Sequence, residues 1–196
     1  MYDFNTWKEV SNILKDKTVG NVRIDHFEVT ENNMGMSFRE SIPKGRYVRL
    51  HIGNTMMMSN TPMEYFTNRE FMEKAHGDIL IGGLGLGCVL HCLSKKKNIN
   101  SITVVEYSQD VIDAVLPQYN FGDNIRVIQG DVFKYKPDRK YNCIYMDVWA
   151  YINSDIAKEM SHLKRRYGQY LVSKEEDKRR YNDCWCFYEA KNNLRI

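Results

Sequence analysis

Short apolar runs along the chain alternate with segments in which apolar residues recur at every third or fourth position. Four runs predict buried strands: residues 78–81, 102–105, 125–128 and 141–146. After the first run, apolar residues recur at helical spacing over residues 88–93. After the second run they do so over residues 111–115, in a predicted helix that begins at the N-cap Ser108 and ends at Pro117. This alternation of strand and helix predicts an α/β fold with a parallel sheet.

The pattern before residue 61 is different. Apolar residues recur at helical spacing over residues 4–14, and Val22, Ile24 and His26 then alternate with polar residues as in a strand that ends at polar residues 31–33. Two extended runs, 46–52 and 55–58, are joined by Gly53-Asn54, which suits a two-residue hairpin turn. We expect an N-terminal helix and small antiparallel β subdomain over residues 1–60, joined to a Rossmann-like domain over 61–196 in one compact unit.

The sequence predicts that a helix begins after residue 61. Thr61 is placed as the N-cap, Pro62 occupies the first helical position, and Glu64 completes a capping box. The helix is predicted to run to about residue 75. Its polar positions face either a cleft or solvent, with solvent favoured for each of them: Asn68, Arg69, Glu70 and Glu73.

The C-terminal part predicts a helix over residues 154–167, capped by Asn153 or Ser154. The mixed charges of residues 174–180 are typical of a solvated face. Only 49 residues follow Asp147, which is short for the last strands of a seven-stranded sheet. We therefore expect a C-terminally trimmed sheet, with residues 184–188 as one further strand.

Composition narrows the class of protein. The 196 residues fit one soluble domain, 43% of them are hydrophobic, and no apolar run reaches the roughly 20 residues of a membrane span. A net charge of +3 gives no argument for a nucleic-acid partner, and the N-terminus resembles no signal peptide, so a cytoplasmic location is expected.

Five cysteines without a C-x-x-C pair predict buried, reduced thiols. Cys88, His91 and Cys92 share helical spacing, but no metal site is predicted.

A glycine-rich loop follows the first strand of the α/β part. Glycines at 83, 85 and 87 allow a sharp turn and bring backbone N–H groups against a ligand, which predicts a nucleotide cradle. The dinucleotide pattern G-x-G-x-x-G fails, because Cys88 stands at its last position, and the Gly-Lys-Ser/Thr of a P-loop is missing.

The loop Gly83-x-Gly85-x-Gly87 resembles motif I of class I S-adenosylmethionine (SAM) methyltransferases and of spermidine synthases. Residues 50–72 look like the hairpin and gate helix of spermidine synthases, and the whole chain looks like the small spermidine-synthase-like proteins of phages and prophages, which would place it in a host cytoplasm. Two positions depart from these families. Asn68-Arg69-Glu70 stands where spermidine synthases have a Tyr-His-Glu gate, and Ile81 stands where methyltransferases commonly have an acid.

Three carboxylates follow successive strands of the predicted sheet. Glu106 comes 23 residues after Gly83, where an acid accepts hydrogen bonds from both ribose hydroxyls of a nucleotide. The resemblance implies that Asp131 meets the adenine amino group. Asp147 ends the fourth strand at the same edge, where ligands of open parallel sheets bind. Together with the loop these residues predict SAM, or decarboxylated SAM, as the cofactor.

The resemblance also implies a reaction. In spermidine synthases an aspartate at the position of Asp147 takes the amine proton, and a second aspartate, replaced here by Ala150, binds the polyamine. Methyl transfer to an unidentified small molecule is therefore ranked above aminopropyl transfer, and a non-catalytic module that binds an adenosyl ligand or a partner stays open. Trp149, Tyr151 and Glu70 are the candidate walls of the acceptor pocket. Nucleic-acid methylation is disfavoured, because the Asn/Asp-Pro-Pro-Tyr and Pro-Cys motifs are missing, and homo-oligomerisation stays open.

Overall fold

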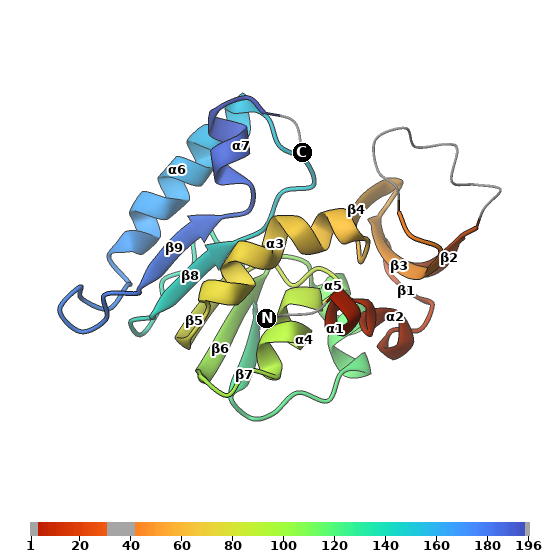
Figure 1. Ribbon diagram of the computed structural model, residues 1–196, viewed down its shortest axis with the longest axis horizontal. Helices are drawn as coiled ribbons and strands as arrows, with labels where there is room; N and C mark the ends of the chain where they lie inside the picture. The colour runs from red at the N-terminus through yellow and green to blue at the C-terminus, as the bar shows by residue number, and fades with distance from the viewer. Residues whose placement is uncertain (1–3, 31–41, 195–196) are drawn as a thin grey trace.

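The computed structural model describes residues 4–30 and 42–194, which form two sheets with helices around them (Figure 1). The N-terminal part contains two short helices and four strands: α1 (Phe4–Lys8), α2 (Val10–Ile13), β1 (Lys17–Val19), β2 (Val22–Val29), β3 (Gly45–Ile52) and β4 (Thr55–Ser59). The α/β part contains α3 (Pro62–Lys74), β5 (Gly77–Gly82), α4 (Cys88–Ser94), β6 (Ile99–Glu106), α5 (Gln109–Val115), the 3₁₀ turn η2 (Leu116–Gln118), β7 (Ile125–Gln129), β8 (Cys143–Met146), α6 (Ser154–Gly168), β9 (Tyr181–Cys184) and α7 (Phe187–Lys191).

The larger sheet has five strands in the order β7-β6-β5-β8-β9, and every neighbouring pair is parallel. Counted in chain order within this sheet, the strands run 3-2-1-4-5, which is the Rossmann order without its sixth strand. The predicted Rossmann-like, C-terminally trimmed sheet is therefore confirmed. The order reverses between β5 and β8, and this switch point is where such sheets bind ligands.

Alternating side chains bury both faces of this sheet. On β5, Ile79 and Ile81 join the core shared with α3, α4 and the N-terminal part, whereas Leu80 joins the core under α6. Tyr145 and Met146 of β8 are divided between the two cores in the same way. A strand buried on both faces reads as a continuous apolar run, which is why these strands were visible in the sequence.

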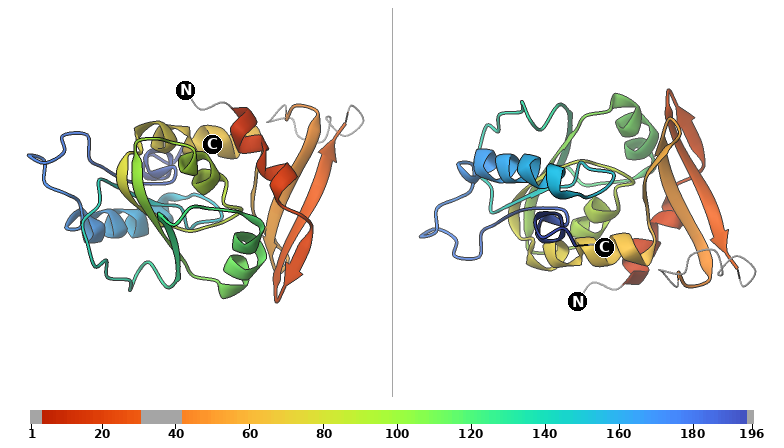
Figure 2. Two further views of the ribbon diagram at one scale, coloured as in Figure 1. Left: turned by 90° about the horizontal axis from the view of Figure 1, so that it is seen from below. Right: turned by 90° about the horizontal axis from the view of Figure 1, so that it is seen from above.

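The smaller sheet is antiparallel, in the order β1-β2-β3-β4, and stands beside the parallel sheet (Figure 2). The predicted hairpin is confirmed, with Gly53 at φ +58° in the turn between β3 and β4. Val22 and Leu50 of this sheet belong to the same core as Ile79, so the packing continues across residue 60. The strand end predicted at residues 31–33 lies outside the described residues, and β2 ends at Val29.

Two predicted elements are corrected in part. The single helix over residues 4–14 is two short helices that meet at Glu9. At residue 61 the helix begins as predicted, but the Thr61 side chain makes no capping hydrogen bond. Its hydroxyl instead lies 2.9 Å from that of Ser59, because both are buried between the hairpin and the helix.

The position predicted for the last strand is wrong. Residues 184–188 do not form a strand: β9 is Tyr181–Cys184, and the chain then enters α7. The ladder with β8 ends where Trp185 N–H donates to the Met146 carbonyl oxygen, at 2.8 Å. Cys186 then adopts a left-handed conformation, φ +48°, that turns the chain off the sheet. Within the described residues, no helix is long and apolar enough to cross a membrane.

Candidate active site

A cavity of about 510 Å³ lies at the switch point of the parallel sheet. Its walls come from the carboxyl ends of β5, β6, β7 and β8, from the β3–β4 hairpin, and from the first turn of α3. The glycine loop lines it together with the three carboxylates that the sequence singled out: Glu106, Asp131 and Asp147. The structure therefore brings together residues that are separated by more than 60 positions in the chain.

The glycine loop has a left-handed backbone at three positions, with φ of +95° at Gly83, +51° at Gly85 and +74° at Gly87. A Cβ atom at Gly83 would overlap the Asp147 carbonyl oxygen, and one at Gly85 would overlap the Met58 sulfur. Glycine is therefore required here both by conformation and by close approach of neighbouring chain segments.

Most N–H groups of the loop already have partners. Leu84 N–H donates to Glu106 Oε2 at 2.8 Å, and Leu86 N–H points at the sulfur of Met58 at 3.1 Å. Gly85 N–H has no hydrogen-bond partner among the described residues. The loop thus presents a single open donor at the cavity wall, rather than the row of bare N–H groups that its glycines suggest.

Glu106 and Asp131 are fixed by backbone donors. The two carboxylate oxygens of Glu106 accept from Leu84 N–H and Ser108 N–H, each at 2.8 Å. Asp131 Oδ1 accepts from Phe133 N–H at 2.8 Å. A carboxylate has about four acceptor positions, so each group keeps capacity for a ligand hydroxyl or amine.

Asp147 lies where α3 meets the end of β8. Burial raises the pKa of its carboxyl to about 7, and a hydrogen bond from Asn68 offsets part of this rise. Asn68 is fully buried: its Nδ2 donates to the Glu64 carbonyl oxygen at 3.0 Å and its Oδ1 accepts from the Tyr145 hydroxyl at 3.1 Å. A carboxyl group that titrates near neutral pH in a cavity can exchange a proton with a bound molecule.

The cavity is strongly acidic. Five carboxylates line it, and no lysine, arginine or histidine does so within the described ranges: the five are Glu64, Glu106, Asp131, Asp147 and Glu159. Glu159 accepts a hydrogen bond from Trp149 Nε1 at 3.0 Å. Such a cavity favours a ligand that carries positive charge and hydrogen-bond donors.

The proposed walls of the acceptor pocket do not converge. Trp149 lines the cavity beside Asp147, whereas Tyr151 lines neither cavity and is 65% exposed. Glu70 lines a second cavity, of about 700 Å³, on the other side of α3. Tyr145 is part of both walls.

Sequence reasoning missed the residues that support Asp147 and close the cavity. Asn68 was assigned to solvent as the favoured alternative, and this assignment is wrong, because the side chain is fully buried. Met58 of the hairpin and Trp185 after β9 were not singled out, although both line the cavity. The Met-rich end of the hairpin was the only visible signal for Met58, and the position of Asn68 depends on how α3 docks on β8.

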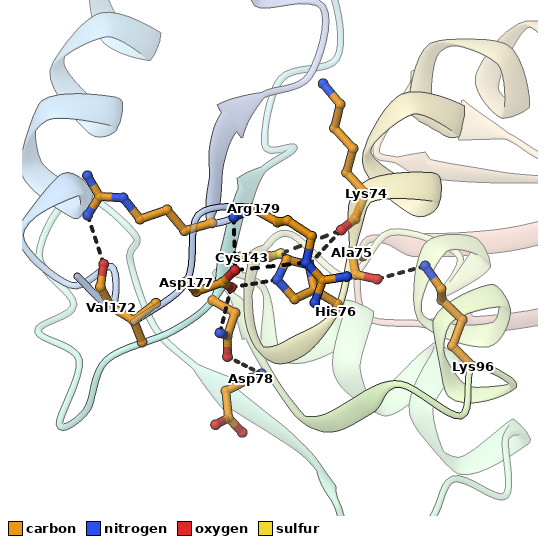
Figure 3. A network of polar contacts seen from close by, with 11 residues as sticks. Lys74, Ala75, His76, Asp78, Lys96, Cys143, Val172, Asp177 and Arg179 are labelled. Atoms are coloured by element: carbon orange, nitrogen blue, oxygen red, sulfur yellow. Dashed lines mark hydrogen bonds and ion pairs between the residues drawn. The ribbon is translucent and has the colours of Figure 1, made fainter. Parts of the chain in front are cut away.

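A second polar network lies at the opposite end of the strands (Figure 3). His76 Nε2 is 2.6 Å from Asp177 Oδ2, and its Nδ1 is 2.8 Å from the Lys74 carbonyl oxygen and 3.5 Å from Cys143 Sγ. Asn142 Nδ2 also donates to Asp177, at 2.8 Å. The order Cys-His-Asp resembles a nucleophilic triad, but the Cys143 side chain is fully buried and burial raises the pKa of its thiol. This network therefore joins the charged segment 173–180 to the sheet rather than forming a reactive site.

All five cysteines are buried, as predicted, and none is in a disulfide in this structure. Burial raises the pKa of Cys92 to about 12. His91 lies on α4, and its Nε2 is 3.0 Å from Glu9 Oε2. Within residues 4–30 and 42–194, no group of three or more histidine, cysteine or acidic side chains is arranged to hold a metal ion.

No protein-family model matches the sequence, and no curated protein is significantly similar to it. Solved structures with partial similarity include a DhpI-SAM-HEP complex, with 19% identity and a TM-score of 0.45 over 57% of this chain and 50% of that one. The N-methyltransferase NodS from Bradyrhizobium japonicum WM9 with S-adenosyl-L-homocysteine has 13% identity and a TM-score of 0.46 over 57% of this chain and 58% of that one. The glycopeptide N-methyltransferase MtfA has 17% identity and a TM-score of 0.42, over 53% and 47%.

These matches span about half the length of the proteins concerned. NodS and MtfA are N-methyltransferases and the DhpI complex contains SAM, but similarity at this level assigns no activity to this chain. The functional argument therefore depends on the cavity at the switch point and on the residues that line it.

Proposed function

We propose that this protein is a transferase that uses SAM or its decarboxylated form. The observation that carries the proposal is the convergence of the glycine loop, Glu106, Asp131 and Asp147 on one cavity at the switch point of the sheet. The chain fits such a ligand, because the loop carries no side chain at Gly83 and Gly85, which both line the cavity, and the Gly85 N–H has no partner among the described residues. The acidic wall also suits a sulfonium cation.

The proposed roles follow from position and chemistry. Glu106 would accept hydrogen bonds from the ribose hydroxyls, and Asp131 would accept one from the adenine amino group. The glycine loop would lie against the chain that extends from the sulfur. Of the three remaining carboxylates, Glu159 already accepts a hydrogen bond from Trp149 Nε1, and Glu64 and Asp147 would face the amino group of that chain and the acceptor.

When bound, the sulfonium supplies an alkyl carbon whose leaving group is already activated. Asp147 would then accept the proton that the acceptor nucleophile loses as its lone pair bonds to that carbon, and the sulfur would keep the electron pair of the broken bond. Because burial raises the pKa of Asp147 to about 7, the carboxylate is a stronger base than an exposed aspartate. Asn68 would hold it in position from α3.

We rank methyl transfer to a small molecule first, because Ala150 leaves no second carboxylate for a polyamine at that position. One observation favours the alternative, aminopropyl transfer from decarboxylated SAM. The cavity has five carboxylates and, among the described residues, no basic side chain to pair with the carboxylate of SAM. A cofactor that lacks this carboxylate avoids the repulsion.

The product distinguishes the two reactions. The purified protein is incubated with SAM or decarboxylated SAM and the small-molecule fraction of a cell extract, and the thioether product is measured. S-adenosylhomocysteine formed from SAM supports methyl transfer, and methylthioadenosine formed only from decarboxylated SAM supports aminopropyl transfer. Asp147→Asn should greatly slow the formation of either product, whereas Asp155→Asn should not, because Asp155 is exposed in the first turn of α6. If neither thioether forms with any acceptor fraction, the proposal of a transferase is wrong.

A further inference from the structure

The second cavity has a composition of its own. It lies between α3, β8, β9 and α7, and its volume is about 700 Å³. Three carboxylates line it, Glu70, Asp183 and Glu189, together with six aromatic rings: Phe66, Phe71, Tyr145, Tyr181, Phe187 and Tyr188. Two of these rings are largely exposed, with 63% of Phe66 and 68% of Tyr188 open to solvent. No lysine, arginine or histidine in the described part of the chain lines it.

Two of the carboxylates already hold an ammonium group of the chain itself against a ring. Lys74 Nζ is 2.5 Å from Glu70 and lies 5.1 Å from the centroid of the Tyr181 ring. Lys164 Nζ is 2.9 Å from Asp183 and lies 4.1 Å over the Phe187 ring. Each lysine thus combines a salt bridge with a cation–π contact. At two places on the margin of this cavity, a carboxylate and an aromatic ring therefore hold an ammonium group of the chain.

The third carboxylate is different. Glu189 is half-buried, and its carboxylate has no hydrogen-bond or ion-pair partner among the residues that the structure describes. Tyr188 precedes it and lines the same cavity. A carboxylate and an aromatic ring therefore both line this wall, and no lysine in the described part of the chain pairs with the carboxylate.

From this arrangement we propose that the second cavity binds a small organic cation, an ammonium group attached to an apolar or aromatic body. The charged end would pair with Glu189 and contact the Tyr188 ring, and the body would lie against the rings of the cavity wall. The combination of apolar lining and a few charged groups is typical of small-molecule sites. The inference does not depend on the proposed transfer reaction, because it concerns binding to a cavity separate from that of Glu106.

The test is isothermal titration of the full chain with three amines, phenethylamine, cyclohexylmethylamine and choline, and with 2-phenylethanol as the uncharged counterpart of the first. At least one amine should bind saturably, and phenethylamine should bind at least about tenfold more tightly than 2-phenylethanol, because only the ammonium group pairs with a carboxylate. Repeating the titrations with Glu106→Ala should leave amine binding unchanged, which separates this site from the cofactor site.

Two variants test the position of the site. Glu189→Gln should weaken amine binding about tenfold and leave binding of 2-phenylethanol unchanged. Tyr188→Ala should weaken amine binding about twofold to fivefold, since a cation–π contact at a partly exposed ring is modest. Glu175→Gln is the control, because Glu175 is exposed and lines neither cavity. The inference is overturned if no amine binds, if 2-phenylethanol binds as tightly as phenethylamine, or if Glu189→Gln and Glu175→Gln have equal effects.

Discussion

Two aspartates show how the surroundings of a carboxyl group set its chemistry. Burial would raise the pKa of both. For Asp147 burial prevails, and its pKa rises to about 7. For Asp177, hydrogen bonds from Asn142, His76 and the Arg179 N–H outweigh burial and lower the pKa to about 2. The first carboxyl group is therefore suited to proton exchange at neutral pH, and the second to a structural role.

Asp147 gives the first prediction. If its carboxylate takes the acceptor proton, kcat/KM should rise with pH through about 7 and level off above it, because the base must lose its own proton first. Asp147→Asn should lower kcat by about 100-fold to 10,000-fold. Steady-state rates between pH 5.5 and 9 are the measurement, and wild-type activity in Asp147→Asn would remove Asp147 from the mechanism.

The same pKa predicts a change in stability. The folded pKa of Asp147, about 7, is above its unfolded value of roughly 3.9, so between these pH values the folded state binds more protons. The free energy of unfolding contributed by this group therefore falls as pH rises from about 4 to about 7. Asp147→Asn carries no such charge, and its Tm relative to wild type should increase between pH 5 and pH 8. A constant difference across this range would show that Asp147 has no raised pKa.

At the level of elements, the glycine loop makes the clearest prediction. Gly83→Ala and Gly53→Ala both place alanine at positive φ, which costs about 1–2 kcal/mol. At Gly53 nothing lies within 4 Å of the added Cβ, whereas at Gly83 it overlaps the Asp147 carbonyl oxygen. Overpacking of this kind adds about 1–3 kcal/mol, so Gly83→Ala should be the more destabilised of the two in urea unfolding.

The two variants should also differ in ligand binding. Gly53 lies in the hairpin turn and does not line the cavity, so Gly53→Ala should bind an adenosyl ligand as wild type does. Gly83→Ala should bind it weakly or not at all, because the loop must shift away from β8. Equal stability and equal affinity of the two variants would contradict the packing described for the loop.

The strands of the parallel sheet were predictable because both of their faces are buried. Residues 79–81 and 143–146 are apolar without interruption, and the glycines that end β5 mark the turn. β9 was not predictable in this way, because Asn182 and Asp183 are polar. Lys164 of α6 pairs with Asp183 at 2.9 Å, and the Lys164 carbonyl oxygen accepts from Asn182 Nδ2 at 2.8 Å. Both polar side chains therefore have a partner on α6, although Asn182 Oδ1 is buried without a hydrogen-bond partner among the described residues. The sequence does not show such partners.

At the level of the whole molecule, contacts between distant segments decide what the sequence could not. The charge run 174–180 was expected to be a solvated face, and most of it is exposed. Asp177 and Arg180 are half-buried, and Asp177 turns inward to His76, which is 101 residues earlier in the chain (Figure 3). The convergence of the carboxylates at the sheet edge could be predicted, because they follow strands of one parallel sheet. The second cavity could not be predicted, because it depends on how α7 packs beside α3 and β9.

The Asp177 network gives a prediction about stability. The pKa of the Asp177 carboxyl group is lowered to about 2, so the contribution of this group to stability is present above about pH 4 and is lost as pH falls toward 2. Asp177→Asn should lower the free energy of unfolding at pH 7 by about 1–3 kcal/mol, since His76 and Asn142 lose a charged partner. That corresponds to a decrease in Tm of roughly 2–4 °C per kcal/mol. Glu176→Gln, at an exposed neighbour, is the control, and the same Tm in both variants at pH 7 would contradict the structural role.

The central claim is that the cavity at the switch point binds an adenosyl ligand through Glu106. Calorimetric titration of the wild-type chain with SAM, decarboxylated SAM, S-adenosylhomocysteine and methylthioadenosine tests it most directly. We expect at least one of the four to bind with one site per chain. Glu106→Ala should weaken that binding about tenfold to a hundredfold, or about 1.5–3 kcal/mol, because the ribose hydroxyls lose their acceptor. Failure of all four ligands to bind the folded wild-type protein, or equal affinity for wild type and Glu106→Ala, would contradict the claim.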